Sequence, residues 1–96
     1  MELTGKCKEE FEKWHKEVQK YNIGWFYKLQ SEHKYGVFEN YFDSVGIRIS
    51  INQHDGTYWY DIQSPFFECD EMKTRPEVRI AAIEKANELR NEVLNK

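Results

Sequence analysis

Apolar residues recur every three or four positions near the start of the chain, which is the period of an α-helix. The stripe consists of Cys7, Phe11, Trp14, Val18 and Tyr21. Lys, Glu and Gln, which favour helices, fill most of the remaining positions. Thr4 is able to cap the beginning of this helix, and Asn22 or Gly24 to end it. We therefore predict a helix over residues 5–21.

A second helical stripe follows, formed by Tyr35, Phe38, Phe42 and Val45. The adjacent aromatic residues Tyr41 and Phe42 break the alternation that a strand would show. Gly46 stands where a helix C-terminal glycine is expected, and Ser31 is the expected N-cap. These features predict a helix over residues 32–44. The preceding run, 25–29, is too short to be classified by its period, with an extended conformation as one interpretation.

The central part of the chain alternates strictly between apolar and polar residues, as in two strands joined by a tight turn. The turn is Asp55-Gly56, a pair that accepts positive φ at both positions. The predicted strands are 47–53 and 57–63. A two-residue loop gives the cross-strand pairs His54–Thr57, Asn52–Trp59, Ile51–Tyr60 and Ile49–Ile62. This register places the isoleucines and Tyr58, Tyr60 and Ile62 on one face.

The remainder of the chain predicts one short strand and one long helix. Pro65 ends the second strand, and residues 66–69 are expected to form a short edge strand. Thr74 and Glu77 have the spacing of a capping box before a helix over 75–94. The apolar side of that helix consists of Val78, Ala81, Ala82, Ile83, Ala86, Leu89 and Val93. The expected fold is a single α+β domain, 1–96: a small antiparallel sheet packed on one face by helices about 5–21, 32–44 and 75–94.

Charge is unevenly distributed along the 96 residues, whose net charge is −3. Residues 31–72 hold two basic against eight acidic residues, and both ends of the chain are mildly basic. Either the ends neutralise the middle in the fold, or the middle presents an acidic face to a basic partner. The low net charge argues against binding of long nucleic acid. No apolar run could span a membrane, and the first residues lack a signal-peptide core, so a cytoplasmic protein is expected.

Catalytic and metal-binding patterns are weak. His15, His33 and His54 have no metal-ligand spacing, and Cys7 and Cys69 do not form a knuckle with them. The acidic cluster Glu68, Asp70 and Glu71 could hold a metal, but such a run is usually a solvated corner. We therefore expect a protein that is not an enzyme and has no metal or cofactor.

The polar face of the predicted hairpin is the candidate binding surface. It carries Arg48, Ser50, Asn52, His54, Thr57, Trp59, Asp61 and Gln63. Trp59 either folds onto Arg48 or a neighbouring loop, or anchors a peptide or a planar ligand. In the second case the expected binding residues are Trp59, Arg48, Asn52, Asp61 and His54, with Trp25 as a second wall.

Three segments of the chain resemble a group of short uncharacterised phage and prophage proteins, chiefly of the Bacteroidetes. They are residues 3–14, 35–47 and 74–88, which include Tyr35-Gly36-Val37-Phe38, Phe42-Asp43-Ser44-Val45-Gly46-Ile47 and Thr74-Arg75-Pro76-Glu77. The resemblance implies a small accessory viral protein that acts by binding in the host cytoplasm. It supplies no functional residue.

The leading hypothesis is a non-enzymatic binding protein of phage type, a counter-defence inhibitor of a host protein. The alternative is a sponge for a signalling nucleotide, whose phosphates Arg48, Lys28 and Arg75 could neutralise, although the acidic middle argues against it. A small metal-dependent hydrolase that uses Glu68–Glu71 and a homodimer that forms through a sheet edge are the remaining classes.

Overall fold

Four helices and three strands make up the described part of the chain, which comprises residues 2–19, 21–63, 66–68 and 71–96 of a computed structural model. The helices are α1 (Gly5–Val18), α2 (Ile23–Tyr27), α3 (Ser31–Ser44) and α4 (Arg75–Leu94). The strands are β1 (Ile49–His54), β2 (Thr57–Gln63) and β3 (Phe66–Glu68). The expected α+β class is confirmed, and the short third strand is present as an antiparallel neighbour of β2.

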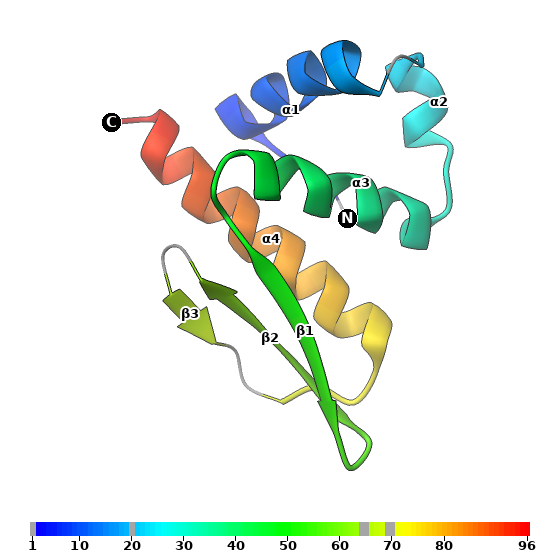
Figure 1. Cartoon of the computed structure of the whole chain (residues 1–96), viewed down its shortest axis with the longest axis vertical. Coiled ribbons are helices and arrows are strands. Elements are labelled where there is room, and N and C mark those ends of the chain that lie inside the picture. Colours follow the sequence, from blue (N-terminus) through cyan, green and yellow to red (C-terminus); the bar gives the residue numbers. More distant parts are fainter. Residues whose placement is uncertain (1, 20, 64–65, 69–70) are drawn as a thin grey trace.

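The helices form a layer behind and above the sheet (Figure 1). α4 crosses one face of the sheet and contacts both β1 and β2. α3 contacts α4 and β1, α1 packs against α3 and α4, and α2 packs against α1. The predicted packing of helices on the sheet is therefore carried mainly by α4, while α1 is held by the other helices. No helix among the described residues is both long and apolar enough to cross a membrane.

The hairpin has the predicted register. Ile49 lies opposite Ile62, Ile51 opposite Tyr60 and Asn52 opposite Trp59. The turn residues have positive φ, 49° at Asp55 and 77° at Gly56, which is the conformation that a two-residue hairpin turn requires. One face is consequently buried against α4, through residues that include Ile49, Tyr60 and Ile62.

The helical end of the molecule is organised around the buried ring of Phe11. Its centroid lies 5.0 Å from that of Phe38, 5.2 Å from Phe26 and 5.4 Å from Tyr41. These tilted and edge-on arrangements are the ones that aromatic quadrupoles favour. Phe42 is also buried within a helix, as the sequence predicts.

The region between α1 and α3 differs from what the sequence predicted. The first helix ends at Val18, and Val18 and Tyr21 are 52% and 38% exposed, while His15 is fully buried in their place. The short helix α2, which the sequence did not reveal, accounts for these differences. It includes the first part of the run 25–29, for which an extended conformation was one interpretation. Asn22 accepts a hydrogen bond from the Gly24 N–H at 2.6 Å and so starts α2. Phe26 of α2 packs against His15, with 5.4 Å between the two ring centroids.

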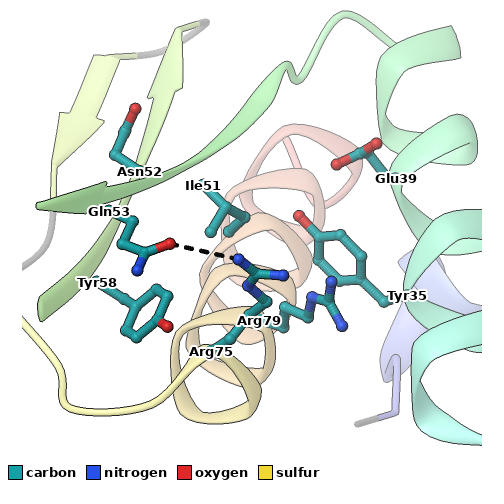
Figure 2. Close-up of a pocket in the computed structure, with 8 residues that line it drawn as sticks. All are labelled: Tyr35, Glu39, Ile51, Asn52, Gln53, Tyr58, Arg75 and Arg79. Atoms are coloured by element: carbon teal, nitrogen blue, oxygen red, sulfur yellow. Dashed lines mark hydrogen bonds between the residues drawn. The ribbon is translucent and has the colours of Figure 1, made fainter. Parts of the chain in front are cut away.

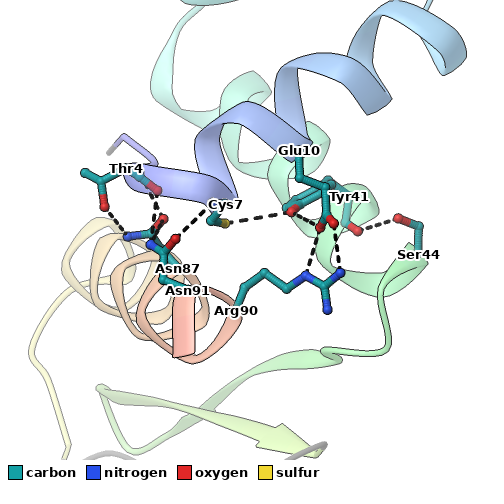
Figure 3. A network of polar contacts seen from close by, with 8 residues as sticks. All are labelled: Thr4, Cys7, Glu10, Tyr41, Ser44, Asn87, Arg90 and Asn91. Carbon is teal, nitrogen blue, oxygen red and sulfur yellow. Dashed lines mark hydrogen bonds and ion pairs between the residues drawn. The ribbon is translucent and has the colours of Figure 1, made fainter. Parts of the chain in front are cut away.

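Helix capping follows the sequence at α4 but differs at the other two long helices. The Thr74 hydroxyl accepts from the Glu77 N–H at 3.3 Å, as the capping box predicts. α3 begins at Ser31, so its N-cap is Gln30. At α1 the Thr4 side chain makes no cap hydrogen bond. Instead Asn91 of α4 accepts from the Cys7 N–H at 2.9 Å, so a residue far along the chain caps the first helix (Figure 3).

Candidate functional site

The outer face of the sheet brings together three of the predicted binding residues. Trp59 is partly buried and lies opposite Asn52. The Asn52 amide donates to the Asp61 carboxylate at 2.9 Å. These three side chains form a small polar and aromatic surface on the side of the sheet away from α4.

The other predicted residues of that surface are engaged elsewhere. The Arg48 Nε lies 3.6 Å from an Asp43 carboxylate oxygen, and both side chains are largely exposed. His54 lies beside the hairpin turn, 3.1 Å from Asp55. Trp25 is 72% exposed on α2, at the far end of the molecule from the sheet (Figure 1). The prediction that Trp25 forms a second wall of this surface is therefore wrong, because α2 folds back over α1.

A groove opens on the opposite side of the sheet, where β1 diverges from α3. α3 ends at Ser44 and β1 begins at Ile49, so the two elements diverge from the short connection between them. α4 forms the floor between them (Figures 1 and 2). The cavity there has a volume of about 420 Å³. We call it the arginine groove; it is lined by Tyr35, Glu39, Ile51, Asn52, Gln53, Tyr58, Arg75 and Arg79.

Arg75 and Arg79 lie four residues apart on α4, so both side chains project from the same side of that helix. The Arg75 guanidinium lies 5.7 Å from the centroid of the Tyr58 ring, and the Arg79 guanidinium 5.3 Å from that of Tyr35. Arg75 also donates to the Gln53 side-chain oxygen at 3.4 Å (Figure 2). Among the residues that the structure describes, neither arginine has a carboxylate within ion-pair distance.

Tyr35 and Glu39 form the α3 wall of the groove. The Tyr35 hydroxyl is buried close to the Glu39 carboxylate, although the two do not reach the geometry of a standard hydrogen bond. Burial raises the pKa of Tyr35, and the nearby Glu39 carboxylate raises it further. The hydroxyl therefore stays protonated, which leaves the two guanidiniums and one carboxylate as the charges of the groove.

The sequence did not reveal the arginine groove, although it singled out Arg75 as a phosphate contact. Arg79 and Tyr35 come from helices whose packing no local pattern predicts. One signal was available. Along α4 neither Arg75 nor Arg79 has an acidic residue three or four positions away, so neither can be neutralised within its own helix.

A third arginine on α4, Arg90, forms a network of polar contacts with α1 and α3 (Figure 3). Arg90 donates to both Glu10 carboxylate oxygens, at 2.8 and 2.9 Å. The Tyr41 hydroxyl donates to the same carboxylate at 2.6 Å and lies 3.8 Å from the Cys7 sulfur. The Arg90 hydrogen bonds lower the pKa of Glu10. Burial raises the pKa of Cys7 to about 11, so this cysteine is a thiol rather than a nucleophile.

Metal-ligating groups do not gather in the described part of the chain: no three His, Cys, Asp or Glu side chains lie close enough to hold a metal ion. The acidic cluster that the hydrolase hypothesis needs falls largely outside that part. Cys69 and Asp70 are not among the described residues, and neither is the side chain of Glu68. Comparisons with protein-family models, with curated proteins and with solved structures give no match to this chain.

Proposed function

We propose that this chain is a non-enzymatic binding protein that holds an anionic group of its ligand in the arginine groove. The observation that carries the proposal is the pair Arg75 and Arg79, two permanent positive charges that line one cavity and have no described carboxylate partner. A guanidinium presents a planar set of donors that matches a carboxylate or a phosphate in two-point contacts.

The tyrosines prepare these arginines for binding. Each guanidinium lies over an aromatic ring, which restricts its rotation before the ligand arrives and reduces the entropy lost on binding. The cavity volume of about 420 Å³ is within the usual range for small-ligand sites, about 300–1,000 Å³. Glu39 on the α3 wall would repel a second negative charge there, so the groove favours an anion placed over α4.

The resemblance to short phage proteins supplies the biological setting of the proposal: a viral accessory protein in the host cytoplasm whose partner is a host protein. The arginine groove supports this partner through an acidic side chain or carboxylate of that protein. The same arginines could also bind the alternative ligand, a nucleotide, through its phosphates. The counter-defence role is supported by the resemblance to phage proteins alone and not by the arginine groove.

The outer face of the sheet is a second candidate, favoured by the partly exposed Trp59 beside the Asn52–Asp61 pair. Tryptophan residues often dominate the energy of protein interfaces. The Asp61 carboxylate of this surface suits a basic group of a partner protein. This surface shares Asn52 with the lining of the arginine groove, but the two sites prefer opposite charges, so variants of Trp59 and of the groove arginines test them separately.

The test is a titration with inorganic phosphate and with acetate, followed by NMR of the arginine side-chain Nε–H signals. We expect the signals of Arg75 and Arg79 to shift together, and Arg75→Gln with Arg79→Gln to weaken binding at least about tenfold, since hydrogen bonds to charged groups contribute about 1.5–3 kcal/mol each. Arg48→Gln is the matched control, because Arg48 is exposed and outside the groove. If Arg48→Gln weakens binding as much as the double variant, or if neither anion shifts the groove signals, the proposal is wrong.

A further inference from the structure

The two strands of the hairpin differ in how the backbone groups on their outer sides are paired. On the β3 side, β2 pairs with Phe66–Glu68, and farther along Tyr58 exchanges two backbone hydrogen bonds with Met72, at 2.8 and 2.6 Å. The backbone groups that β2 directs away from β1 are therefore paired along most of the strand, and the short β3 is the edge strand on this side. β1 is the outermost strand on the other side, and in the described part of the chain no strand pairs with its outer edge.

The register shows which backbone groups that edge presents. The Gln63 N–H donates to the Arg48 carbonyl at 3.0 Å, and in an antiparallel ladder such hydrogen-bonded pairs alternate. Ser50 and Asn52 therefore direct their backbone groups toward β2, whereas Ile51 and Gln53 direct theirs away from it. The two bonds of Tyr58 to Met72 agree with this alternation, because Tyr58 is the partner of Gln53.

Ile51 and Gln53 are also lining residues of the arginine groove. Their outward N–H and C=O groups stand at the β1 wall of the groove, and Arg75 and Arg79 lie on its floor (Figure 2). A strand placed beside β1 would satisfy these groups and turn every second side chain toward α4. Side chains two residues apart in a strand are about 6.7 Å apart, and the two arginines are about 6 Å apart along the helix axis.

From this juxtaposition we infer that the ligand of the arginine groove is an extended acidic polypeptide segment that adds to the outer edge of β1, with acidic residues at alternate positions over Arg75 and Arg79. The inference rests on the proposed function and specifies its ligand. Strand addition of this kind obtains affinity from the main chain and specificity from alternate side chains.

Charge and exposure favour this ligand over two others. A second copy of this chain, paired through its own β1, would place Ile49, Ile51 and Gln53 over the arginines, and none of these is negatively charged. A nucleotide would need an open aromatic face for its base, but Tyr35 is only 7% exposed, and a guanidinium already lies over the ring of each of the two tyrosines that line the groove. An acidic strand uses both the backbone edge and the arginine pair.

The experiment is a selection from a displayed library of random seven-residue peptides on the full chain, after depletion on the Arg75→Gln, Arg79→Gln double variant. The selected peptides should carry Asp or Glu at alternate positions. They should bind Gln53→Pro about tenfold more weakly, because proline removes one outward N–H. Proline is tolerated there, since that N–H is not part of the ladder with β2. Gln53→Val is the matched control, which removes the side-chain contact with Arg75 and keeps the N–H.

A second measurement does not depend on how well Gln53→Pro folds. Two versions of a selected peptide are methylated at alternate backbone nitrogens, one at the odd-numbered and one at the even-numbered positions. The version whose methylated nitrogens face β1 should not bind, and the other should bind as well as the unmethylated peptide. The inference is wrong if no peptide with alternating acidic residues is selected. It is also wrong if Gln53→Pro binds the peptides as well as the parent protein does and neither methylated version binds more weakly than the unmethylated peptide. If that happens while phosphate still shifts the signals of Arg75 and Arg79, the proposed function stands without strand addition; if phosphate also fails, both are wrong.

Discussion

The two ends of α4 use arginine in opposite ways. At the C-terminal end Arg90 is fastened to Glu10 by two hydrogen bonds, and its side chain is only 18% exposed. At the N-terminal end Arg75 and Arg79 lie against tyrosine rings beside a cavity and have no described carboxylate partner. The arginine at the C-terminal end of α4 is neutralised within the fold, and the two arginines at the N-terminal end remain available to bind an anionic ligand.

This difference indicates which polar groups of the molecule are structural and which are functional. A partly buried ion pair joins α1 to α4 and commits the Nε and one Nη of Arg90 to the Glu10 carboxylate. An arginine held only by a ring face and an amide has given up little of its capacity to bind an anion. The helical end is expected to determine stability, and the hairpin end to determine binding.

The largest effect is expected from the aromatic cluster of the helical end. Phe11→Ala should lower the free energy of unfolding by about 3–5 kcal/mol, because it removes a fully buried ring that contacts the surrounding aromatic rings. Urea denaturation measures this loss. A loss below about 1 kcal/mol would mean that this cluster is not the stabilising core.

The next largest effect separates the two kinds of arginine. Arg90→Gln should cost about 1.5–3 kcal/mol of stability, since it breaks two charged hydrogen bonds to Glu10. Arg79→Gln should change stability by about 0.5 kcal/mol or less, as substitutions outside such networks usually do, while it weakens anion binding. Equal losses of stability in the two variants would contradict the comparison.

His15 should make the helical end sensitive to acid. Burial lowers the pKa of His15 in the folded state, so below about pH 6.5, the ordinary value for histidine, the unfolded state binds more protons than the folded one. Stability is therefore complete above that pH and falls as the pH drops toward the folded-state pKa. His15→Phe should flatten this fall in melting temperature between pH 7 and 5. The exposed His33 is the control, and His33→Phe should leave the fall unchanged.

The smallest effect on stability is expected at the outer face of the sheet. Trp59→Ala should cost about 1 kcal/mol or less, because Trp59 lies on the face away from α4 and is only partly buried. It should leave phosphate binding in the arginine groove unchanged. If Trp59→Ala instead lowers the melting temperature by many degrees, Trp59 is a structural residue and the second candidate surface is lost.

Local patterns predicted the parts of the fold that depend on neighbours in sequence. The register of the hairpin follows from the Asp55-Gly56 turn and strict alternation, and the start of α4 from Thr74 and Glu77. The five residues of α2 are fewer than two helical turns, so they show no period that could reveal a helix. His15 was not expected in the core, because its burial depends on Phe26 of the unforeseen α2.

The candidate site was harder to predict than the fold, because its walls come from three distant segments. Arg75 and Arg79 are visible in the sequence as unpartnered charges, but only the divergence of α3 from β1 gives them a shared cavity. The Trp59 surface, in contrast, lies within one hairpin, and the predicted register brings Trp59, Asn52 and Asp61 to the same face. Trp25 was wrongly assigned to it, since pairing of distant aromatic residues has no local signature.

The asparagine cap on α1 has a consequence for the order in which the protein forms during synthesis. Asn87 and Asn91 hold Thr4 and the Cys7 N–H, more than 80 residues earlier in the chain. During synthesis α1 is made more than 80 residues before the groups that complete its N-terminus. A nascent chain that stops before Asn87 leaves this helix end open and lacks the C-terminal part of α4, which packs against α1. The protein should therefore acquire its structure in one late step, and stalled fragments should be readily cleaved by proteases.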